Sequence, residues 1–282
     1  MNFRFFKELF SGFLPAIGLF LTIIKLMEFF FPNRLLWLQS NWVFAGLIVC
    51  SFAYSLYINF PYRTARFRIS GTDAYISIRI GDILLSDENI VIPTSNFFNT
   101  SPEIVAPNTL LGQYLKKYYN NDTSQIAKTI DRDIEKSLTH VKGEHVEVRK
   151  GKTISYPLCT VAAFKTPSNK KAFLISITKI TENHEIRVES NISYIHQALD
   201  NLWNRTETDL DNGILHITPF GSGVSRAFNK TTESIIYIAQ NFIDRAKRKR
   251  PCSELVIFIK HGSVNQIEYL ELRKIIKFLA QG

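Results

Sequence analysis

Ile214-Leu215-His216-Ile217, followed by Pro219-Phe220-Gly221-Ser222-Gly223-Val224-Ser225-Arg226, is the stretch that decides the fold of this chain. Its first four residues form a short apolar run of strand type, and a long amphipathic helix is predicted after the glycines, from about Thr231 to Arg248. Thr231 or Thr232 is placed to cap that helix. Glycines between a strand and a helix let backbone N–H groups approach an anion, and the helix dipole adds roughly half a positive charge there. The stretch therefore predicts an α/β fold with an anion-binding turn.

Two other interpretations of the glycine turn stay open. The turn can be an ordinary link between a strand and a helix, in which the glycines only make it tight. Arg226 can supply positive charge to a phosphate, or it can pair with a nearby carboxylate. No lysine follows the glycines in GKS/T form and the spacing does not match GxGxxG, so a Walker-type ATPase and a dinucleotide-binding turn are disfavoured.

Strands and helices alternate through the rest of the chain after the first 60 residues. Tyr75–Ile80 shows period-two alternation, and Ile90–Ile92 is predicted as a short strand that Pro93 ends. A β-hairpin is predicted from residues 159–164 and 172–180, a buried strand at 255–259, and helices at 109–119, 124–138, 191–203 and 267–279. This order predicts a mixed sheet with helices on both faces.

The N-terminus contains two apolar segments of membrane length. The first runs from about Leu9 to Phe31 and the second from Trp42 to Phe60, and each reaches the roughly 20 residues that cross a bilayer as a helix. A cleaved signal peptide is disfavoured for the first, because it lacks a small-x-small site and a second segment follows closely. Basic residues flank the pair on its outer ends, so the positive-inside rule places both ends in the cytoplasm. We expect a transmembrane hairpin over residues 1–62 and a cytosolic domain over 63–282.

The composition bounds the class of partner. A formal charge of +9 permits contact with nucleic acid, with anionic lipid or with a phosphorylated small molecule. The basic run Arg245–Arg250 ends the long helix, where cations complement the dipole, so we expect no nucleic-acid binding. The three cysteines and six histidines are scattered, so neither a metal site nor a disulfide framework is predicted, and a reducing compartment is indicated.

Polar residues follow two of the predicted strands. Asp82 comes after a strand and a glycine, a position from which a carboxylate can accept from the exocyclic amine of adenine, although an isolated aspartate there is more often a turn residue. Thr94, Ser95 and Asn96 leave the next strand in succession. Ligands of open α/β sheets bind at the carboxyl ends of strands, so these side chains are candidates for contact with ribose hydroxyls.

Together, Arg79-Ile80-Gly81-Asp82-Ile83, the strand ending in Pro93-Thr94-Ser95-Asn96, and Pro219 to Arg226 before a long helix resemble a divergent macro domain, the ADP-ribose-binding fold. With the apolar N-terminus and the runs Ala106–Gln113 and Tyr156–Ala162, the chain is similar to the macro-domain membrane effectors of Thoeris anti-phage defence. The resemblance covers nearly the whole chain. It implies a macro-like mixed sheet between helices, preceded by a two-helix transmembrane hairpin.

The resemblance also implies a ligand and a role. Asp82 would contact adenine, the Gly221 to Val224 turn the diphosphate, and Ser95, Asn96 and the Asn108 to Gly112 loop the distal ribose or its substituent. The ligand would be an ADP-ribose derivative, a histidine adduct made from NAD by a partner TIR-domain enzyme. Its binding would cause a homo-oligomer in the bacterial inner membrane to rearrange and damage the bilayer, with no catalysis and no cofactor. The complete set of ligand-binding residues expected is Asp82, Ile83, Thr94, Ser95, Asn96, Asn108, Thr109, Leu111, Gly112, Pro219, Phe220, Gly221, Ser222, Gly223, Val224, Ser225 and Arg226.

The chain departs from ordinary macro domains at two motifs. Pro93-Thr94-Ser95-Asn96 stands in place of the expected Asn-Ala-Ala-Asn run, and Ala106–Gln113 replaces the glycine-rich first phosphate loop. Both changes disfavour hydrolysis of ADP-ribosyl groups and favour a bulkier ligand. A membrane-tethered hydrolase of ADP-ribose derivatives is the alternative, but no His-Asp or paired-carboxylate constellation is evident in the sequence.

Overall fold

The computed structural model describes residues 3–30, 45–46, 48–53, 64–147, 150–180, 186–187, 192–221 and 227–282. The chain divides into two compact units, Met1–Tyr62 and Arg63–Gly282. We call them the N-terminal unit and the sheet unit and describe each by itself.

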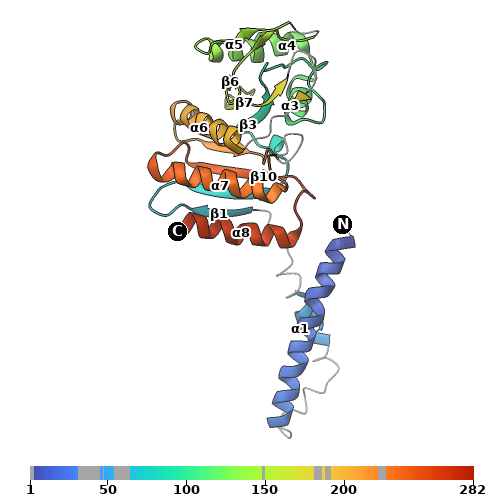
Figure 1. Ribbon diagram of the computed structural model, residues 1–282. Helices are drawn as coiled ribbons and strands as arrows, with labels where there is room; N and C mark the ends of the chain where they lie inside the picture. Colours follow the sequence, from blue (N-terminus) through green and yellow to red (C-terminus); the bar gives the residue numbers. More distant parts are fainter. Residues whose placement is uncertain are drawn as a thin grey trace. The chain divides into compact units, whose positions relative to one another are not determined.

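In the described part of the N-terminal unit, residues Phe3–Phe30 form the long helix α1, with Pro15 inside it, and residues 45–46 and 48–53 are also helical (Figure 1). The Phe13 ring lies 6.1 Å from the ring of Phe52, edge to face. Within the residues that the structure describes, no helix combines the length and the apolar character that crossing a bilayer requires. The predicted transmembrane hairpin is therefore not supported, although most of its second segment, Trp42 to Phe60, lies outside the described residues.

The sheet unit is built on an eight-stranded mixed sheet of order β1-β2-β10-β9-β3-β7-β6, with β8 paired to β7. Five neighbouring strands, β2, β10, β9, β3 and β7, run parallel, while β1 and β6 are antiparallel at the two edges. Strands β4 and β5 form a separate two-stranded sheet. The strands are β1 (Thr64–Arg68), β2 (Tyr75–Ile80), β3 (Asn89–Ser95), β4 (Glu144–His145), β5 (Ile154–Ser155), β6 (Val161–Lys165), β7 (Lys171–Ile180), β8 (Ile186–Arg187), β9 (Ile214–Ile217) and β10 (Glu254–Ile259).

Helices cover both faces of this sheet, so the predicted α/β fold with a mixed sheet is confirmed (Figure 1). The helices on one face are α6 (Ile192–Asp209), α7 (Thr231–Arg248) and α8 (Gln266–Gln281), and those on the other are α3 (Leu110–Tyr119), α4 (Thr123–Ile126) and α5 (Arg132–Leu138). Alternate residues of one strand enter the two cores: Leu255, Ile257 and Ile259 pack with α7, while Val256 and Phe258 join the cluster on the opposite face. This two-sided burial explains the continuous apolar run of β10.

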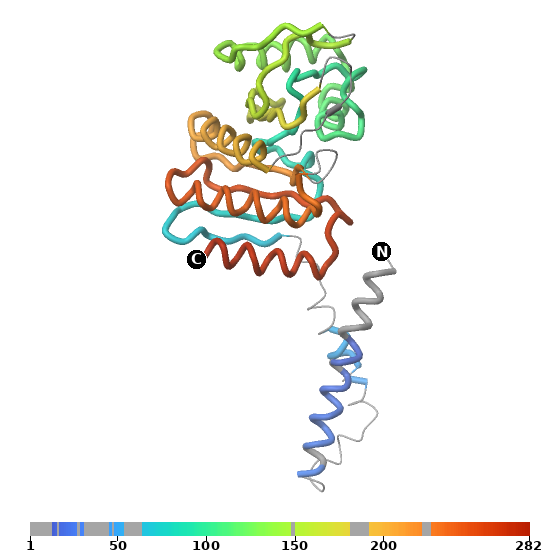
Figure 2. Tube along the Cα trace, viewed as in Figure 1, coloured from blue at the N-terminus to red at the C-terminus, as the bar shows by residue number. Residues whose placement is uncertain are grey.

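Segments far apart in sequence close the edge of the sheet. Helix α8, at the end of the chain, runs beside the edge strand β1, and Ser70 N donates to Ala280 O at 2.7 Å (Figure 2). The buried side of α8 presents Tyr269, Leu272 and Ile276 to the core.

Two local predictions, for Pro93 and for the cap of α7, were wrong, and a third, the helix at 124–138, was right in extent but not in regularity. Pro93 does not end its strand. β9 pairs with β3 only at Asn89 and Ile90, so at Pro93 the strand has a single neighbour, β7. Proline lacks a backbone N–H, and a strand with a neighbour on one side only tolerates that loss. The predicted helix 124–138 is interrupted by a π-helical turn, η3 (Ala127–Asp131). Helix α7 is not capped by a threonine: Glu233 accepts from Asn229 N (3.0 Å) and Lys230 N (3.4 Å) instead.

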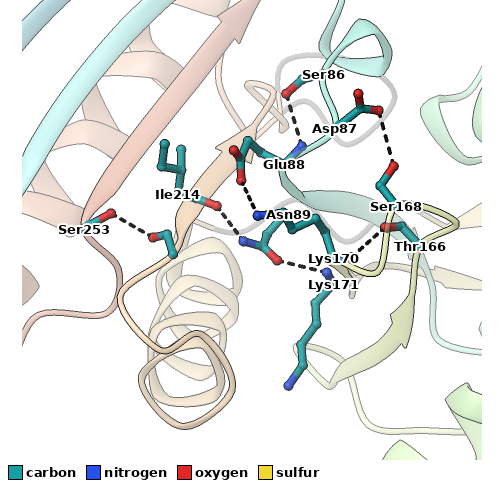
Figure 3. Close-up of polar contacts among 11 residues, drawn as sticks. Ser86, Asp87, Glu88, Asn89, Thr166, Ser168, Lys170, Lys171, Ile214 and Ser253 are labelled. Carbon is teal, nitrogen blue, oxygen red and sulfur yellow. Dashed lines mark hydrogen bonds and ion pairs between the residues drawn. The ribbon is translucent and has the colours of Figure 1, made fainter.

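Buried Asn89 ties three strands together where they begin (Figure 3). Its Nδ2 donates to Ile214 O of β9 at 2.8 Å, and its Oδ1 accepts from Lys171 N of β7 at 2.9 Å. Ser253, before β10, donates to Gly213 O through its N–H at 3.0 Å and its hydroxyl at 3.2 Å. These bonds fix the amino ends of the parallel strands, and so the register of their opposite, carboxyl ends.

Candidate functional site

The carboxyl ends of the parallel strands lie at one edge of the sheet, and the predicted site residues follow them. Ile80 of β2 is in register with Ile259 of β10, and Ile257 of β10 with Ile217 of β9. β9 in turn neighbours β3. The segments after β2, β9 and β3 therefore meet at this edge, which we call the carboxyl edge.

Asp82, after β2, is an exposed turn residue. Its Oδ1 accepts from Leu84 N at 2.9 Å and caps the short 3-10 helix η2 (Ile83–Leu85). A carboxylate has about four acceptor positions, so this single bond leaves capacity for a ligand amine.

Asn96, after β3, is buried and already engaged. Its Nδ2 donates to Ser155 Oγ at 2.8 Å and its Oδ1 accepts from Ile180 N at 2.9 Å. The side chain thus joins β3, β5 and β7 and forms part of a wall. Thr94 and Ser95 are half-buried and belong to β3 itself, with a register shift between them.

The segment from Asn108 to Gly112 starts α3. Thr109 Oγ1 accepts from Gly112 N at 3.1 Å, and Asn108 O accepts from Gln113 Nε2 at 2.9 Å. A Cβ on Gly112 would lie 2.3 Å from Ala106 O, so only glycine allows the chain to approach this closely. This segment is a helix start that packs against β3.

The two described ends of the turn after β9 are joined by a hydrogen bond. Gly221 has φ +88°, and its carbonyl accepts from Phe228 N at 2.9 Å. Phe220 O accepts from the buried hydroxyl of Ser234 on α7 at 2.6 Å, which fixes the turn to the helix. Pro219 is half-buried, while Ser222, Gly223, Val224, Ser225 and Arg226 lie outside the described residues.

Three of the predicted site residues have core side chains. Ile83 and Leu111 pack in the cluster that contains α3, and Phe220 packs in the cluster that contains α7. Their side chains are buried, so any ligand contact here is left to backbone atoms.

An open cleft of about 420 Å³ adjoins Asn96. Its lining combines two lysines, one glutamate and two tyrosines with smaller polar and apolar side chains. Burial raises the pKa of Tyr156, so this hydroxyl stays protonated at neutral pH and can donate. The lining residues are Asn96, Lys142, Glu144, Ser155, Tyr156, Pro157, Leu158, Lys179, Tyr194 and Gln197.

Cys159 follows the cleft-lining residue Leu158 in the chain and contacts a second one, Tyr194. It has a positive φ of 67°, is buried, and its Sγ lies 3.2 Å from Tyr194 O. Burial raises the pKa of the thiol to about 11, so it is protonated at neutral pH.

Sequence reasoning missed two groups of residues at the site. Lys260 and His261 are exposed and follow β10, which lies between β2 and β9, so they stand at the carboxyl edge between Asp82 and the Gly221 turn. The predicted strand 255–259 was the signal that could have identified them. Lys142 and Glu144 lie near β4, a two-residue strand too short to give a periodic pattern. In the described ranges, no group of three or more histidine, cysteine or acidic side chains is arranged to hold a metal ion.

Known proteins share this architecture. The family model described as "Thoeris protein ThsA, Macro domain" matches residues 76–260. Thoeris protein ThsA of Bacillus amyloliquefaciens (strain Y2) is 25% identical over 244 residues, which cover 81% of this chain and 75% of that protein.

Two solved structures of mutants of an Oceanobacillus iheyensis macrodomain are similar in fold. One has a TM-score of 0.51 at 11% identity and covers 77% of this chain and 93% of that chain. The other, with ADPR, has a TM-score of 0.51 at 12% identity and covers 78% and 100%. At these identities the likeness establishes the macro-domain fold alone. Since the family model spans most of the sheet unit and more than half of the sequence, the chain belongs to the Thoeris protein ThsA macro-domain family.

Proposed function

We propose that this protein is a Thoeris anti-phage defence effector that binds an ADP-ribose-derived nucleotide at the carboxyl edge and responds at a membrane. The observation that carries the proposal is the convergence of Asp82, Asn96 and the Gly221 turn on one edge of a macro-domain sheet. The named relative supports the Thoeris assignment, and the solved macrodomain with ADPR supports the ligand class.

Each part of an ADP-ribose skeleton finds matching chemistry along the edge. The carboxylate of Asp82 suits the adenine amine, and Lys260 and His261 stand beside it. The turn that starts at Gly221 leads to the N-terminus of α7, where the helix dipole favours a diphosphate. In this arrangement the distal ribose points toward Asn96 and the cleft.

The cleft supports a derivative over ADP-ribose alone. Its volume of about 420 Å³ and its pair of lysines with a glutamate suit a substituent that bears both a carboxylate and an amine. Lys142 and Lys179 would pair with the carboxylate and Glu144 with the amine. A histidine adduct of ADP-ribose, made by a TIR-domain enzyme that consumes NAD, has this chemistry.

The proposed role is that of a binding protein. Among the residues that the structure describes, the cleft lining contains one carboxylate, Glu144, and the nearby thiol of Cys159 is protonated, so within that part of the chain neither a carboxylate pair nor a thiolate lies beside the cleft. Incubation of the purified chain with the ADP-ribose derivative tests this part, since free ADP-ribose would accumulate if the protein were a hydrolase.

The membrane part of the proposal rests on the apolar character of the N-terminal unit and not on an observed span. Large apolar side chains on α1 are exposed, among them Leu14, Leu19 and Phe29, and the sequence from Trp42 to Phe60 carries no charged residue. Exposed apolar surface of this extent marks a contact with lipid or protein. We place the protein in the bacterial inner membrane with the sheet unit in the cytoplasm, and infer that ligand binding changes the packing of a homo-oligomer.

Calorimetric titration of the detergent-purified full chain with ADP-ribose and with its histidine adduct tests the ligand. We expect the adduct to bind at least 10-fold more tightly, and Lys142→Glu or Lys179→Glu to remove most of that difference. Lys136→Glu, on the exposed face of α5, is the matched control. Equal binding of both nucleotides would refute the role of the cleft, and binding of neither would refute the proposed function. Dye release from vesicles that contain the chain, on addition of the adduct, tests the membrane response.

A further inference from the structure

The outer face of α8 carries an apolar stripe that the sheet unit leaves in solvent. Ile267 and Phe278 are 64% and 76% exposed, and Leu270 and Ile275 are 38% and 39% exposed. These four apolar residues form one side of the helix, opposite its buried side. Two charged residues, Glu271 and Lys274, lie on the same side. We call this surface the α8 outer face. Exposed apolar residues aligned on one helix face mark an interaction surface.

The α8 outer face is symmetric in sequence about the point between Leu272 and Arg273. Ile267 and Phe278 are equally far from that point, and so are Leu270 and Ile275. Glu271 and Lys274, of opposite charge, form the third equidistant pair. A helix that meets its own copy antiparallel across a two-fold axis brings such equidistant positions into contact.

We propose that the α8 outer face is the interface of a homodimer, in which α8 packs antiparallel against α8 of a second copy. Ile267 then packs on the second copy's Phe278, and Leu270 on its Ile275. Glu271 pairs with the second copy's Lys274, and the same pair forms again on the other side of the axis. A parallel arrangement would place Glu271 beside Glu271, so the charges select the antiparallel one.

The size of this surface sets the expected strength. A single helix pair with four apolar side chains per chain buries less than roughly 1,200 Å², the range of weak and reversible interfaces. Such a contact is favoured when the chains are concentrated at one surface, so it suits a switch between monomer and dimer. The inference supplies a surface for the oligomer of the proposed function but rests on α8 alone.

Charge exchange in the full chain tests the pairing. Glu271→Lys alone and Lys274→Glu alone each place like charges across the axis and should weaken dimerisation about 10-fold in analytical ultracentrifugation. The double variant Glu271→Lys/Lys274→Glu restores both pairs and should recover it. A mixture of the two single variants should form a heterodimer. Leu85→Ser, which removes a 77% exposed leucine elsewhere, is the control and should leave dimerisation unchanged.

Cysteine cross-linking in a Cys50→Ser background tests the direction of the helices. Ile267 and its own copy would be separated by roughly 16 Å along the axis in the antiparallel pair, at 1.5 Å rise per residue. Chains with Ile267→Cys alone should therefore not cross-link, whereas a mixture of Ile267→Cys and Phe278→Cys chains should. Cross-linking of Ile267→Cys to itself, or failure of the double charge variant to recover association, would overturn the proposal. If the dimer proposal fails while these variants still bind the nucleotide, only the α8 interface is refuted and the proposed function stands.

Discussion

Phe228 N donates to Gly221 O at 2.9 Å, and this bond closes the turn that follows β9 onto the start of α7. Gly221 accepts it with φ +88°, and the Phe228 ring packs so closely that a Cβ on Gly221 would lie 3.0 Å from it. The aromatic rings of Phe220 and Phe228, one at each end of the turn, are buried in the core. The turn that we propose to hold the diphosphate is thus fixed at both ends by the core and by one hydrogen bond.

Gly221→Ala should destabilise the protein and weaken nucleotide binding together. A side chain in the left-handed region costs about 1–2 kcal/mol, and the contact with Phe228 adds to this, so we expect a loss of about 2 kcal/mol or more in the free energy of unfolding. Urea denaturation and calorimetric titration measure the two effects. Gly71→Ala is the control, because Gly71 has φ +74° but no atom within 4 Å of its Cβ position. If the two variants lost equal stability, the packing of Phe228 on Gly221 would not matter.

Asn96→Ala should lower stability and selectivity. It leaves Ser155 Oγ and Ile180 N without their partner, and because both groups are only half-buried we expect a cost toward the lower end of about 1–3 kcal/mol. Because Asn96 forms a wall of the cleft, affinity for the histidine adduct should fall more than affinity for ADP-ribose. Ser155→Ala removes only one of the two bonds and should cost about 1 kcal/mol. An equal fall in affinity for both nucleotides would instead indicate a direct contact of Asn96 with the shared skeleton.

Asn89→Ala should destabilise the sheet without touching the site. It removes the bonds to Ile214 O and Lys171 N at the amino ends of β9 and β7, with an expected loss of about 2–3 kcal/mol. Ser253→Ala at the same edge keeps the backbone bond to Gly213 O and should cost less than about 1 kcal/mol. Chemical denaturation compares them. Nucleotide affinity measured well below the unfolding transition should be unchanged in both, and a large fall would show that this edge is coupled to the site.

The bounds of several elements were predicted correctly from the sequence, whereas the ligand-binding residues stay a prediction. β2, β9 and α7 have the predicted bounds, because period-two or period-3.6 alternation runs through them and a Gly or Pro follows each of them: Gly81, Pro219 and Pro251. The end of β3 was predicted wrongly at Pro93, because a strand tolerates proline only where a neighbouring strand is missing on one side. Which strands lie beside β3 is a property of the tertiary structure and cannot be read from the local sequence. Lys142 and Glu144 could not be found, because they line the cleft from a strand of two residues and from the chain before it. Ile83, Leu111 and Phe220 were assigned from their place in a motif, and only packing shows that their side chains face the core.

Stability should fall with acid through His216. This histidine is buried on β9, and its ring centroid lies 4.9 Å from that of Phe258. Burial lowers its pKa from 6.5 to about 4, and the positive charge of Arg79 contributes a smaller part of this shift. Between pH 6.5 and pH 4 the unfolded chain therefore binds a proton at His216 that the folded chain does not. The contribution of His216 to the free energy of unfolding decreases as the pH falls through this range and levels off below about pH 4. The decrease should reach about 3 kcal/mol. His216→Phe removes the titrating group while keeping an aromatic ring. Urea denaturation at pH 7.5 and at pH 4 should show that the stability difference between the native chain and the variant changes by about 3 kcal/mol. Parallel pH profiles of the two proteins would show that His216 is protonated in the folded state as readily as in the unfolded one.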